Sequence, residues 1–477
     1  MEMENGRPLD PLTRRQQIRN ASAFEQDPLE FLRCQLRLHG DIFRFSNTLT
    51  VFQHPDHIHD IFADTHGAFA LGAGEAAGEG GVTGGQAWMS ARADSTHLLG
   101  TSAARASGES VAAAFQAHFA RHADSEIDVV DTFFDICGST VADLCAGPYG
   151  ERLERAAADH LRALLAGAAT SGLLPSWLPL PRARRIRTTG AELAELIDDA
   201  VARGAPPDDP EARNFLQVLA ARGDELGGRL PAMMRTLLVA SLASPAAALA
   251  WGVRELALRP AEAAALREEI ASVGLAGIVR DPLRAAPLSV AFAKEVLRFH
   301  SPAWLLQRDV VRPVTVGGVR LEPGERVAFS LYLLHHDDRW WSEPGTFRPD
   351  RWLADAPAHA PRAYRPFGGG PRICAGAQLG MVQMVCGITT LLAHYDIDAP
   401  GAAAPPGRPE AVRAPSGLRA TLRPRPAPAP PAGGGDGCGG REGRKDGKAQ
   451  NGTDAPLRGD RRRAAGPPLR TPGPDDR

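Results

Sequence analysis

The sequence predicts a mainly α-helical fold with a minor antiparallel β part. Apolar residues recur at helical spacing around residues 108–123 and along a longer run at 231–259. Signals for strands are fewer: apolar residues alternate with polar ones at 41–53 and at 314–330, and the second segment contains Gly-Gly and Pro-Gly turns that are typical of hairpins. No internal repeat is apparent, so these segments are expected to belong to one mainly helical body.

Composition limits the classes of partner. The 477 residues contain 54 lysines and arginines against 56 acidic residues, so no charge excess favours nucleic acid as a partner. The six cysteines form no CxxC pair, which argues against a disulfide framework or a zinc site and indicates a reducing compartment. The chain begins with the polar segment MEMENGRPLDPLTRRQQ, without the apolar run of a signal peptide or a membrane anchor. We therefore expect a cytoplasmic protein with no membrane anchor and no nucleic-acid partner.

Two segments are expected to lie outside the packed core. Residues 423–477 are rich in proline, glycine and arginine and contain few large apolar residues, which predicts a disordered tail. Residues 71–85 form a glycine-rich stretch, but no GK[ST] follows it and no strand with βαβ spacing precedes it. This second segment is interpreted as a flexible covering loop rather than as a phosphate-binding loop.

One cysteine stands in an unusual stretch, FGGGPRICAG, at residues 367–376. The three glycines before it carry no Cβ and tolerate positive φ, so the backbone can turn tightly and approach a flat group, and Gly376 removes bulk just beyond Cys374. Residues 377–393 carry no charge and are interpreted as a buried helix. Cys374 is thus expected at a helix N-terminus, where the helix dipole favours a thiolate, and a metal would be a suitable partner for that thiolate.

The spacing within this stretch resembles a known haem-binding signature. Phe367, Gly370, Arg372, Cys374 and Gly376 reproduce the pattern FxxGxRxCxG, and on this motif the sequence resembles the cytochrome P450 family. The resemblance implies a triangular-prism haem-thiolate domain that binds haem b. It also implies that Cys374 is the proximal ligand of the iron and that the other four residues shape the haem-binding loop.

The resemblance extends over residues 28–422. It includes the segment GDIFRF near the start and the segment LLPSWLPLPRARR at 173–185, which is similar to the family's connection between the F and G helices above the substrate pocket. Residues 1–27 are then an N-terminal extension, and residues 423–477 are the tail.

Two further motifs follow the family's order. Glu295 and Arg298 in KEVLRFHSP match the family's ExxR pair, and Arg351 in FRPDRW lies where the family completes a buried Glu-Arg-Arg network. An acidic and a basic residue three positions apart are by themselves common on exposed helices. The coincidence with the cysteine motif favours the buried network, which the resemblance implies is a stabilising element rather than part of the chemistry.

Four residues are implied to hold the haem propionates. Trp88 and Arg92 in WMSAR match the family's WxxxR, which places them one turn apart on one face of a helix. Arg308 in LLQRDV and Arg372 of the cysteine motif align with further propionate ligands. A guanidinium group suits this task because it pairs with a carboxylate in a bidentate manner.

The family's distal helix usually reads A-G-x-[DE]-T, and this chain departs from that pattern. Ala240 and Ser241 replace A-G, Ala243 stands at the position of the acid, Ser244 replaces the threonine and Pro245 follows. Pro245 has no N–H, so it cannot bond the carbonyl of Ser241 four residues earlier, and a groove with a free acceptor is expected.

This departure leaves two chemical hypotheses open. In the first, Ser244, the carbonyl of Ser241 beside Pro245, ordered water and a substrate hydroxyl deliver protons to oxygen derived from O2. In the second, the acid is absent because the enzyme uses hydrogen peroxide or rearranges a hydroperoxide. A third hypothesis from another class is a non-catalytic partner protein of the same fold, which the intact cysteine motif disfavours.

The preferred reading is a haem-thiolate monooxygenase. By the resemblance, it inserts one oxygen atom from O2 into a small apolar substrate, a secondary metabolite such as a terpenoid or a polyketide. Its electrons are expected to come from separate proteins, a ferredoxin and a ferredoxin reductase. An alanine-rich stretch at 240–250 is compatible with a roomy pocket, although core packing explains the same alanines.

Overall fold

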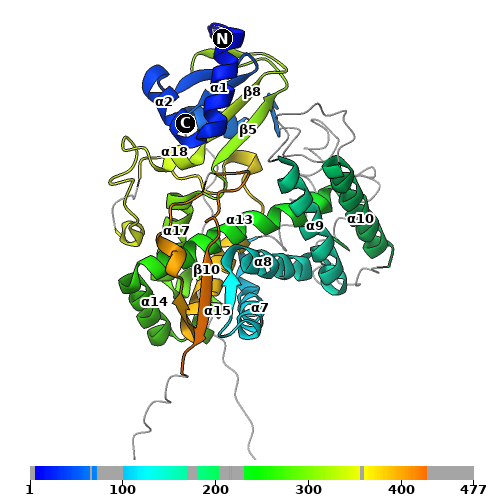
Figure 1. The fold of residues 1–477 in the computed structure, drawn as a ribbon, viewed down its shortest axis with the longest axis vertical. Coiled ribbons are helices and arrows are strands. Elements are labelled where there is room, and N and C mark those ends of the chain that lie inside the picture. Colours follow the sequence, from blue (N-terminus) through cyan, green and yellow to red (C-terminus); the bar gives the residue numbers. More distant parts are fainter. Residues whose placement is uncertain are drawn as a thin grey trace, which may run out of the picture. The chain divides into compact units, whose positions relative to one another are not determined.

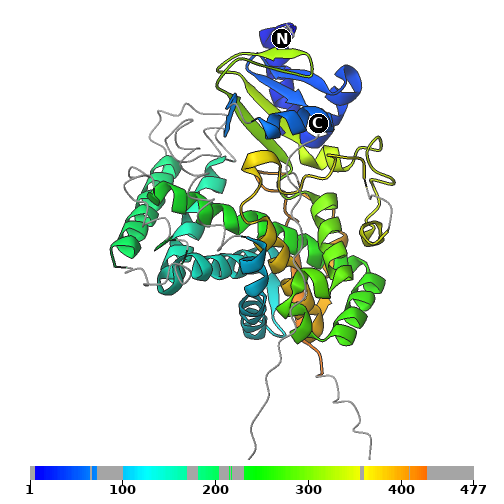
Figure 2. The same cartoon turned by 180° about the vertical axis from the view of Figure 1, so that it is seen from behind.

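A computed structural model describes most of the chain before residue 427 (Figures 1 and 2). The described residues are 6–64, 67–71, 100–168, 181–203, 214, 216–217, 230–354, 359–407 and 409–426. Trp88, Arg92 and most of the predicted covering loop at 71–85 lie outside them, as does the predicted tail from residue 427 onward.

The first part of the chain combines short helices with a sheet. Asp27 caps the second helix, since its side chain accepts a hydrogen bond from the backbone N–H of Glu30, and Pro28 occupies the first helical position, where no N–H is needed. The elements in order are α1 (Arg14–Gln26), α2 (Pro28–His39), β1 (Ile42–Ser46), β2 (Leu49–Phe52), α3 (Pro55–Ala63) and β3 (Phe69–Leu71).

A five-stranded sheet joins this part to a segment from late in the chain. Its strand order is β1-β2-β8-β5-β3, with β5 at Leu305–Val310 and β8 at Arg326–Ser330. All neighbouring pairs are antiparallel except β2 and β8, which run parallel with Thr50 opposite Val327. The predicted β part is therefore mixed rather than purely antiparallel.

Two smaller sheets complete the β part. The Gly-Gly turn expected near residue 317 joins β6 (Val314–Val316) to β7 (Val319–Leu321), and both glycines have positive φ. The other sheet places β10 (Arg419–Pro424) between β4 (Glu126–Asp128) and β9 (Tyr395–Asp398).

Most of the chain is helical, which confirms the predicted fold class. α13 runs through the middle of the helical part, α1 and α2 lie at one end with β5 and β8, and β10 lies among the helices (Figures 1 and 2). The helices are α6 (Thr101–Ala106), α7 (Gly108–Arg121), α8 (Val129–Ala146), α9 (Gly150–Ala168), α10 (Pro181–Arg203), α13 (Leu230–Leu258), α14 (Pro260–Val273), α15 (Leu275–Arg280), α16 (Pro282–Ala285), α17 (Pro287–His300), α18 (Leu331–His335) and α19 (Ala377–His394).

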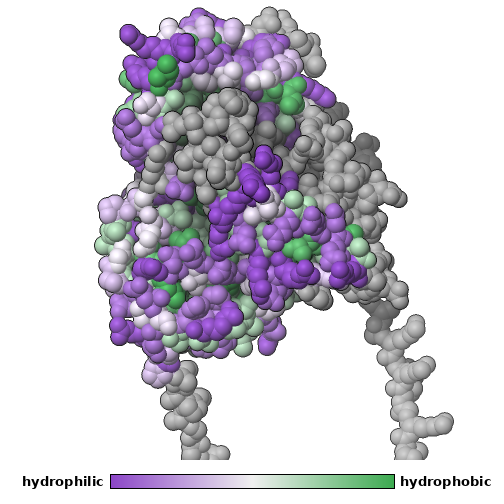
Figure 3. Space-filling view, turned by 45° about the vertical axis from the view of Figure 1, so that its right-hand side comes forward, coloured by the Kyte–Doolittle hydropathy of each residue, from purple (hydrophilic) through white to green (hydrophobic). Residues whose placement is uncertain are grey.

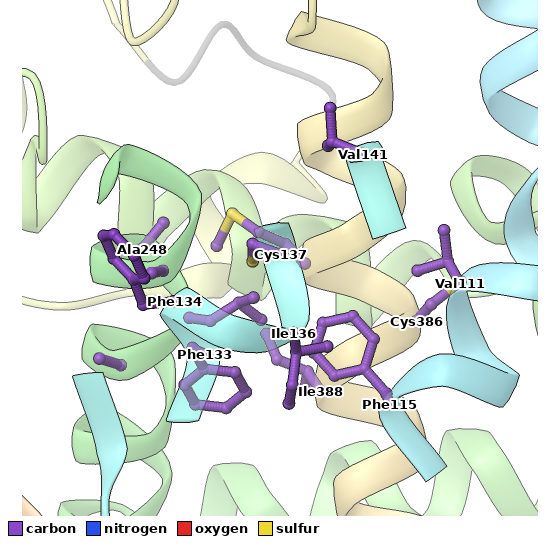
Figure 4. Close-up of a cluster of buried hydrophobic side chains, with 14 of the residues drawn as sticks. Val111, Phe115, Phe133, Phe134, Ile136, Cys137, Val141, Ala248, Cys386 and Ile388 are labelled. Carbon is purple, nitrogen blue, oxygen red and sulfur yellow. The ribbon is translucent and has the colours of Figure 1, made fainter. Parts of the chain in front are cut away.

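The main core forms where α7, α8, α13 and α19 meet (Figure 4). Glycines let these helices approach closely: a Cβ on Gly387 of α19 would lie 2.7 Å from the ring of Phe115, and one on Gly138 of α8 would lie 2.6 Å from Leu242. α19 is buried over nearly its whole length, as expected for the uncharged segment at 377–393. This packing fixes α13 and α19 relative to each other.

Ordered contacts are present at both expected domain boundaries. α1 belongs to the expected N-terminal extension, yet Phe24 stacks on Trp304 at a ring distance of 6.4 Å and Asn20 donates to the carbonyl of Phe45. At the other end, β10 continues to Pro424, beyond the expected end at 422. Hydrogen bonds within the sheet order these last residues, which composition alone had assigned to the tail.

The surface on the face shown in Figure 3 is mostly hydrophilic, with apolar residues in small groups. Two helical segments, Leu237–Leu258 and Ala377–His394, are long and apolar enough to cross a membrane by length and composition. More than half of each is buried inside the fold, and core helices of soluble proteins have the same character.

Candidate active site

A cavity of about 460 Å³ lies between α13, α19 and the loop that carries Cys374. The segment after α17 and strand β5 close one side, and residues of α8 contribute another part of the wall. The predicted site residues that line it are Phe367, Arg372, Cys374, Gly376, Arg308, Ser241, Ser244 and Pro245. The fold thus brings together predicted residues from three separate parts of the sequence.

The cysteine loop is held by backbone hydrogen bonds. The N–H of Cys374 donates to the carbonyl of Phe367 (2.9 Å), and the N–H of Ile373 donates to the carbonyl of Gly370 (3.1 Å). Cys374 is exposed and lines the cavity, and α19 begins three residues later at Ala377 with Gly376 as its N-cap. The cysteine therefore precedes the helix cap rather than occupying the first helical turn.

The glycines of this loop have two different tasks. Gly368 and Gly370 have φ of +76° and +65°, a region that favours glycine. A Cβ on Gly370 would lie only 1.9 Å from the carbonyl oxygen of Phe62 on α3, and this glycine does not line the cavity. Gly370 is needed for close packing against Phe62 of α3. Gly376 faces open space, since a Cβ there would meet no described atom within 4 Å.

Two arginines reach the cavity beside the cysteine loop. Arg308 on β5 is buried, donates to the carbonyl of Gln307 (2.6 Å) and lies over the ring of Phe62 at 5.7 Å. Arg372 donates to the carbonyl of Phe69 (2.5 Å). Together with Cys374 they form a donor set that fits a haem: a thiol for the iron, and guanidinium groups for the propionates.

α13 presents one continuous stripe to the cavity. The lining residues follow helical spacing and are Leu237, Ala240, Ser241, Ser244, Pro245 and Ala248. The helix continues through Pro245. Ala243, which stands where the acid was expected, does not line the cavity and packs against the core.

The two serines of this stripe differ in their hydrogen bonding. The hydroxyl of Ser241 donates to the carbonyl of Leu238 (2.7 Å), so its proton is already used within the helix. Ser244 is half-buried and has no hydrogen-bond partner among the described residues. No Asp or Glu occurs among the described residues that line the cavity.

The Glu295 carboxylate lies at the centre of a buried hydrogen-bond network. Arg298 donates to both of its oxygens (2.8 and 3.0 Å), and Nε of Arg351 donates to one of them (3.2 Å). The indole N–H of Trp352 and the backbone N–H of Arg348 also donate to it (2.9 and 2.8 Å). Glu295 and Arg298 are 0% exposed and Arg351 is 4% exposed, so all three charges are removed from water.

The remaining donors of the two arginines bind backbone carbonyls of the segment between α18 and η3 (Pro349–Trp352). These carbonyls belong to His335, Ser342, Glu343, Pro344 and Thr346. The network therefore ties α17 to a long irregular segment that has little regular structure of its own.

A second buried group links this network to the cysteine loop and was missed from the sequence. The backbone N–H of Arg365 donates to Nε2 of His335 (3.0 Å), so Nδ1 carries the proton and bonds the hydroxyl of Ser301 (2.8 Å). Burial, together with the neighbouring His336 and Arg298, lowers the pKa of His335 well below its usual value and keeps the ring neutral. In the sequence, LLHHDD shows only two histidines beside two acids, a pattern typical of a surface.

Gln383 is another cavity residue outside the predicted set. It lies on α19, is 1% exposed, and its side-chain amide donates to the hydroxyl of Thr140 on α8 (2.7 Å). The available signal was that Gln383 is one of only two glutamines in a mainly apolar helix.

A cysteine loop facing a long helix across a largely apolar cavity, with a buried Glu-Arg-Arg network behind it, defines the class of haem-thiolate proteins. The chain belongs to the cytochrome P450 family, whose sequence model matches residues 31–421. Membership of this family implies a haem-thiolate cofactor.

Several curated relatives are similar to parts of the chain. Cyclooctatin synthase of Streptomyces melanosporofaciens is 34% identical over 265 residues, which are 54% of this chain and 57% of the relative. Pentalenene oxygenase of Streptomyces avermitilis is 29% identical over 312 residues, 62% of this chain and 67% of the relative. Putative cytochrome P450 132 of Mycobacterium tuberculosis is 33% identical over 169 residues, 35% of this chain and 36% of the relative. The first relatives are thus matched over roughly a third to somewhat more than half of their length.

Proposed function

We propose that this protein is a haem-thiolate monooxygenase that inserts one oxygen atom from O2 into a small apolar molecule. The observation that carries the proposal is the position of Cys374, which lines the same cavity as the α13 stripe with Ser241, Ser244 and Pro245. In this assignment Cys374 holds the iron of haem b. Arg308 and Arg372 hold its propionates, together with Trp88 and Arg92 from outside the described residues.

The bound haem supplies the activation of O2, and the thiolate ligand favours cleavage of the O–O bond. The overall reaction consumes a C–H bond, O2, two electrons and two protons; it forms a C–OH group, and the second oxygen atom leaves as water. The chain's own residues have three tasks: they position the haem, exclude bulk water from the apolar cavity, and move protons from Ser244 and bound water towards the oxygen.

The proposed substrate class is a terpenoid or a related secondary metabolite. The described cavity wall above the cysteine loop is built mainly from alanine, leucine and proline side chains, which suit a hydrocarbon skeleton. The names of two relatives, cyclooctatin synthase and pentalenene oxygenase, support the same class.

The proposed electron donors are a ferredoxin and its ferredoxin reductase, in keeping with the family's use of external redox partners. The proposed location is the cytoplasm, where these partners and reduced nicotinamide are available. Neither assignment requires nucleic acid or a membrane anchor.

A peroxide-dependent reaction is a second candidate, and one observation favours it. The described cavity lining contains no carboxylate that could relay protons to oxygen derived from O2. Hydrogen peroxide already carries both protons and both electrons, so such a relay would be less important.

The proposal is tested by spectroscopy followed by turnover. Purified protein reduced with dithionite is expected to give the red-shifted absorbance band of a thiolate-bound haem when carbon monoxide is added. Pentalenene and other terpene hydrocarbons are then offered with NADPH, ferredoxin and ferredoxin reductase, or with hydrogen peroxide alone. Oxygenation that depends on the protein partners is expected; turnover with peroxide alone would establish the second candidate, and protein without haem would indicate a non-catalytic member of the family.

Replacing Ser244 by alanine is expected to uncouple electron use from oxygenation. The amount of product formed per NADPH consumed should fall at least about tenfold. This loss is smaller than the full contribution of proton-transfer catalysis, because ordered water can still carry protons. The measurement compares NADPH oxidation, product and released hydrogen peroxide. Ser272→Ala, an exposed serine on α14, is the matched control, and unchanged coupling in Ser244→Ala would remove this residue from the relay.

A further inference from the structure

Two polar groups of the α13 stripe near Pro245 lack hydrogen-bond partners among the described residues. The carbonyl of Ser241 cannot receive the helical hydrogen bond from position 245, because proline has no N–H. Ser241 and Pro245 both line the cavity, so the missing helical hydrogen bond lies on the face of α13 that lines it. One turn along, the hydroxyl of Ser244 lies on the same face and has no partner among the described residues.

These two groups have complementary requirements. The carbonyl of Ser241 needs a donor, while the hydroxyl of Ser244 can both donate and accept. The hydroxyl of Ser241 cannot act as a donor to either group, since it already donates to the carbonyl of Leu238 at 2.7 Å. A polar group that is buried without a partner is costly, so a ligand that fills the cavity must supply what the helix lacks.

We propose that the Ser241 carbonyl and the Ser244 hydroxyl form a binding site for an alcohol group of the substrate. The substrate O–H donates to the carbonyl of Ser241, and its oxygen accepts a hydrogen bond from Ser244. This inference rests on the proposed function, which it narrows from an apolar molecule to an apolar molecule that already bears a hydroxyl group.

Other polar groups fit this pair less well. A ketone or an ether can accept from Ser244, but it leaves the carbonyl of Ser241 without a donor. A carboxylate would place its charge against that carbonyl, and an ammonium group would find no Asp or Glu among the described lining residues. An alcohol satisfies both groups at once, and the apolar wall on both sides of it accommodates the hydrocarbon skeleton.

The assignment gives the enzyme a place in a reaction sequence. Its substrate must be supplied by a reaction that installs a hydroxyl group on a hydrocarbon skeleton, either an earlier hydroxylation or a cyclisation in which water captures a carbocation. The product would then be a diol or a more oxidised derivative. The bound alcohol would also bring an exchangeable proton to the stripe that contains Ser244.

Three probes that share the adamantane cage separate these interactions: adamantanol, its methyl ether and methyladamantane. The alcohol offers a donor and an acceptor, the ether only an acceptor, and methyladamantane neither. Binding is measured on the haem-loaded protein by equilibrium dialysis, so the readout depends neither on turnover nor on the haem spectrum. The compared quantity is the ratio of the dissociation constants of adamantanol and methyladamantane, which removes the contribution of the shared apolar cage.

Pro245→Ala restores the helical N–H, which then bonds the carbonyl of Ser241. This variant is expected to raise the ratio about tenfold, the usual value of one net hydrogen bond, while methyladamantane binds within about twofold of the wild-type affinity. Ser244→Ala should weaken both the alcohol and the ether, whereas Pro245→Ala should weaken the alcohol alone. Pro260→Ala, at the first position of α14, is the matched control and should change none of the three.

A ratio that is unchanged in Pro245→Ala overturns the proposal, because the Ser241 carbonyl then contributes nothing to alcohol binding. Failure of the wild-type protein to bind adamantanol also overturns the proposal. The same holds if Pro245→Ala lowers the affinity for the ether as much as the affinity for the alcohol. A water molecule that permanently occupies the pair would give the first of these results. The carbon monoxide spectrum and the partner-dependent turnover are recorded separately, so failure here with both of them intact removes only the alcohol site.

Discussion

Replacing Glu295 by glutamine is expected to destabilise the fold by about 3 to 5 kcal/mol, because two buried guanidinium groups would lose the carboxylate that they share. Glutamine has nearly the same shape, so the loss would come from charge rather than from packing. Arg298 and Arg351 would keep their backbone carbonyl partners, but their positive charges would stay buried beside a neutral amide. The segment between α18 and η3 should loosen first, since it depends on these arginines.

The measurement is thermal unfolding followed by circular dichroism, together with the haem content of the purified protein. Glu343→Gln provides the matched control: Glu343 pairs with Arg348 at the surface, and its side chain is 57% exposed. Surface pairs of this kind contribute about 0 to 1 kcal/mol. If both variants lowered the unfolding temperature equally, the Glu295 network would have no special role in stability.

The long helices could be predicted because their signals are local. The sequence predicted helices at 108–123, 231–259 and 377–393, and the structure has Gly108–Arg121, Leu230–Leu258 and Ala377–His394. Each segment carries its apolar pattern within one continuous stretch, and its start is marked by Gly or Pro. Pro245 did not interrupt the second helix, since the surrounding helices bury the turns after it almost completely.

Features that depend on distant contacts could not be predicted. The parallel pairing of β2 with β8 joins strands more than 270 residues apart, and no local pattern encodes that partner. Gly370 looked like a residue that approaches a flat ligand, but its missing Cβ makes room for the carbonyl of Phe62. His335 was not identified from the sequence, because only the fold brings Ser301 and the N–H of Arg365 to its two nitrogens.

The candidate site was predictable as a set of residues but not as an arrangement. Motif spacing identified Cys374, Arg308 and Ser244, and all three line one cavity. It did not reveal that the hydroxyl of Ser241 donates to the carbonyl of Leu238, nor that Ala243 packs against the core instead of lining the cavity. Position 243 therefore lies on a face of α13 that does not line the described cavity.

Replacing Cys374 by serine is expected to abolish the thiolate-type absorbance band of the reduced, carbon monoxide-treated protein and to reduce partner-driven oxygenation below detection. Serine keeps the size of the side chain, so the backbone bonds of the loop to Phe367 and Gly370 should persist. What is lost is the soft, easily deprotonated ligand that determines the electron density at the iron. The measurement is the absorbance spectrum with and without carbon monoxide, combined with product analysis.

Cys145 offers a matched control because it lines the same cavity from α8. Burial raises the pKa of its thiol to about 12, so it stays protonated near neutral pH and cannot replace the ligand. Cys145→Ala should therefore retain the thiolate band, while Cys374→Ser loses it. A thiolate band that survived in Cys374→Ser and disappeared in Cys145→Ala would move the iron to the other wall of the cavity, and the roles of Arg308, Arg372 and the α13 stripe would have to be reassigned with it.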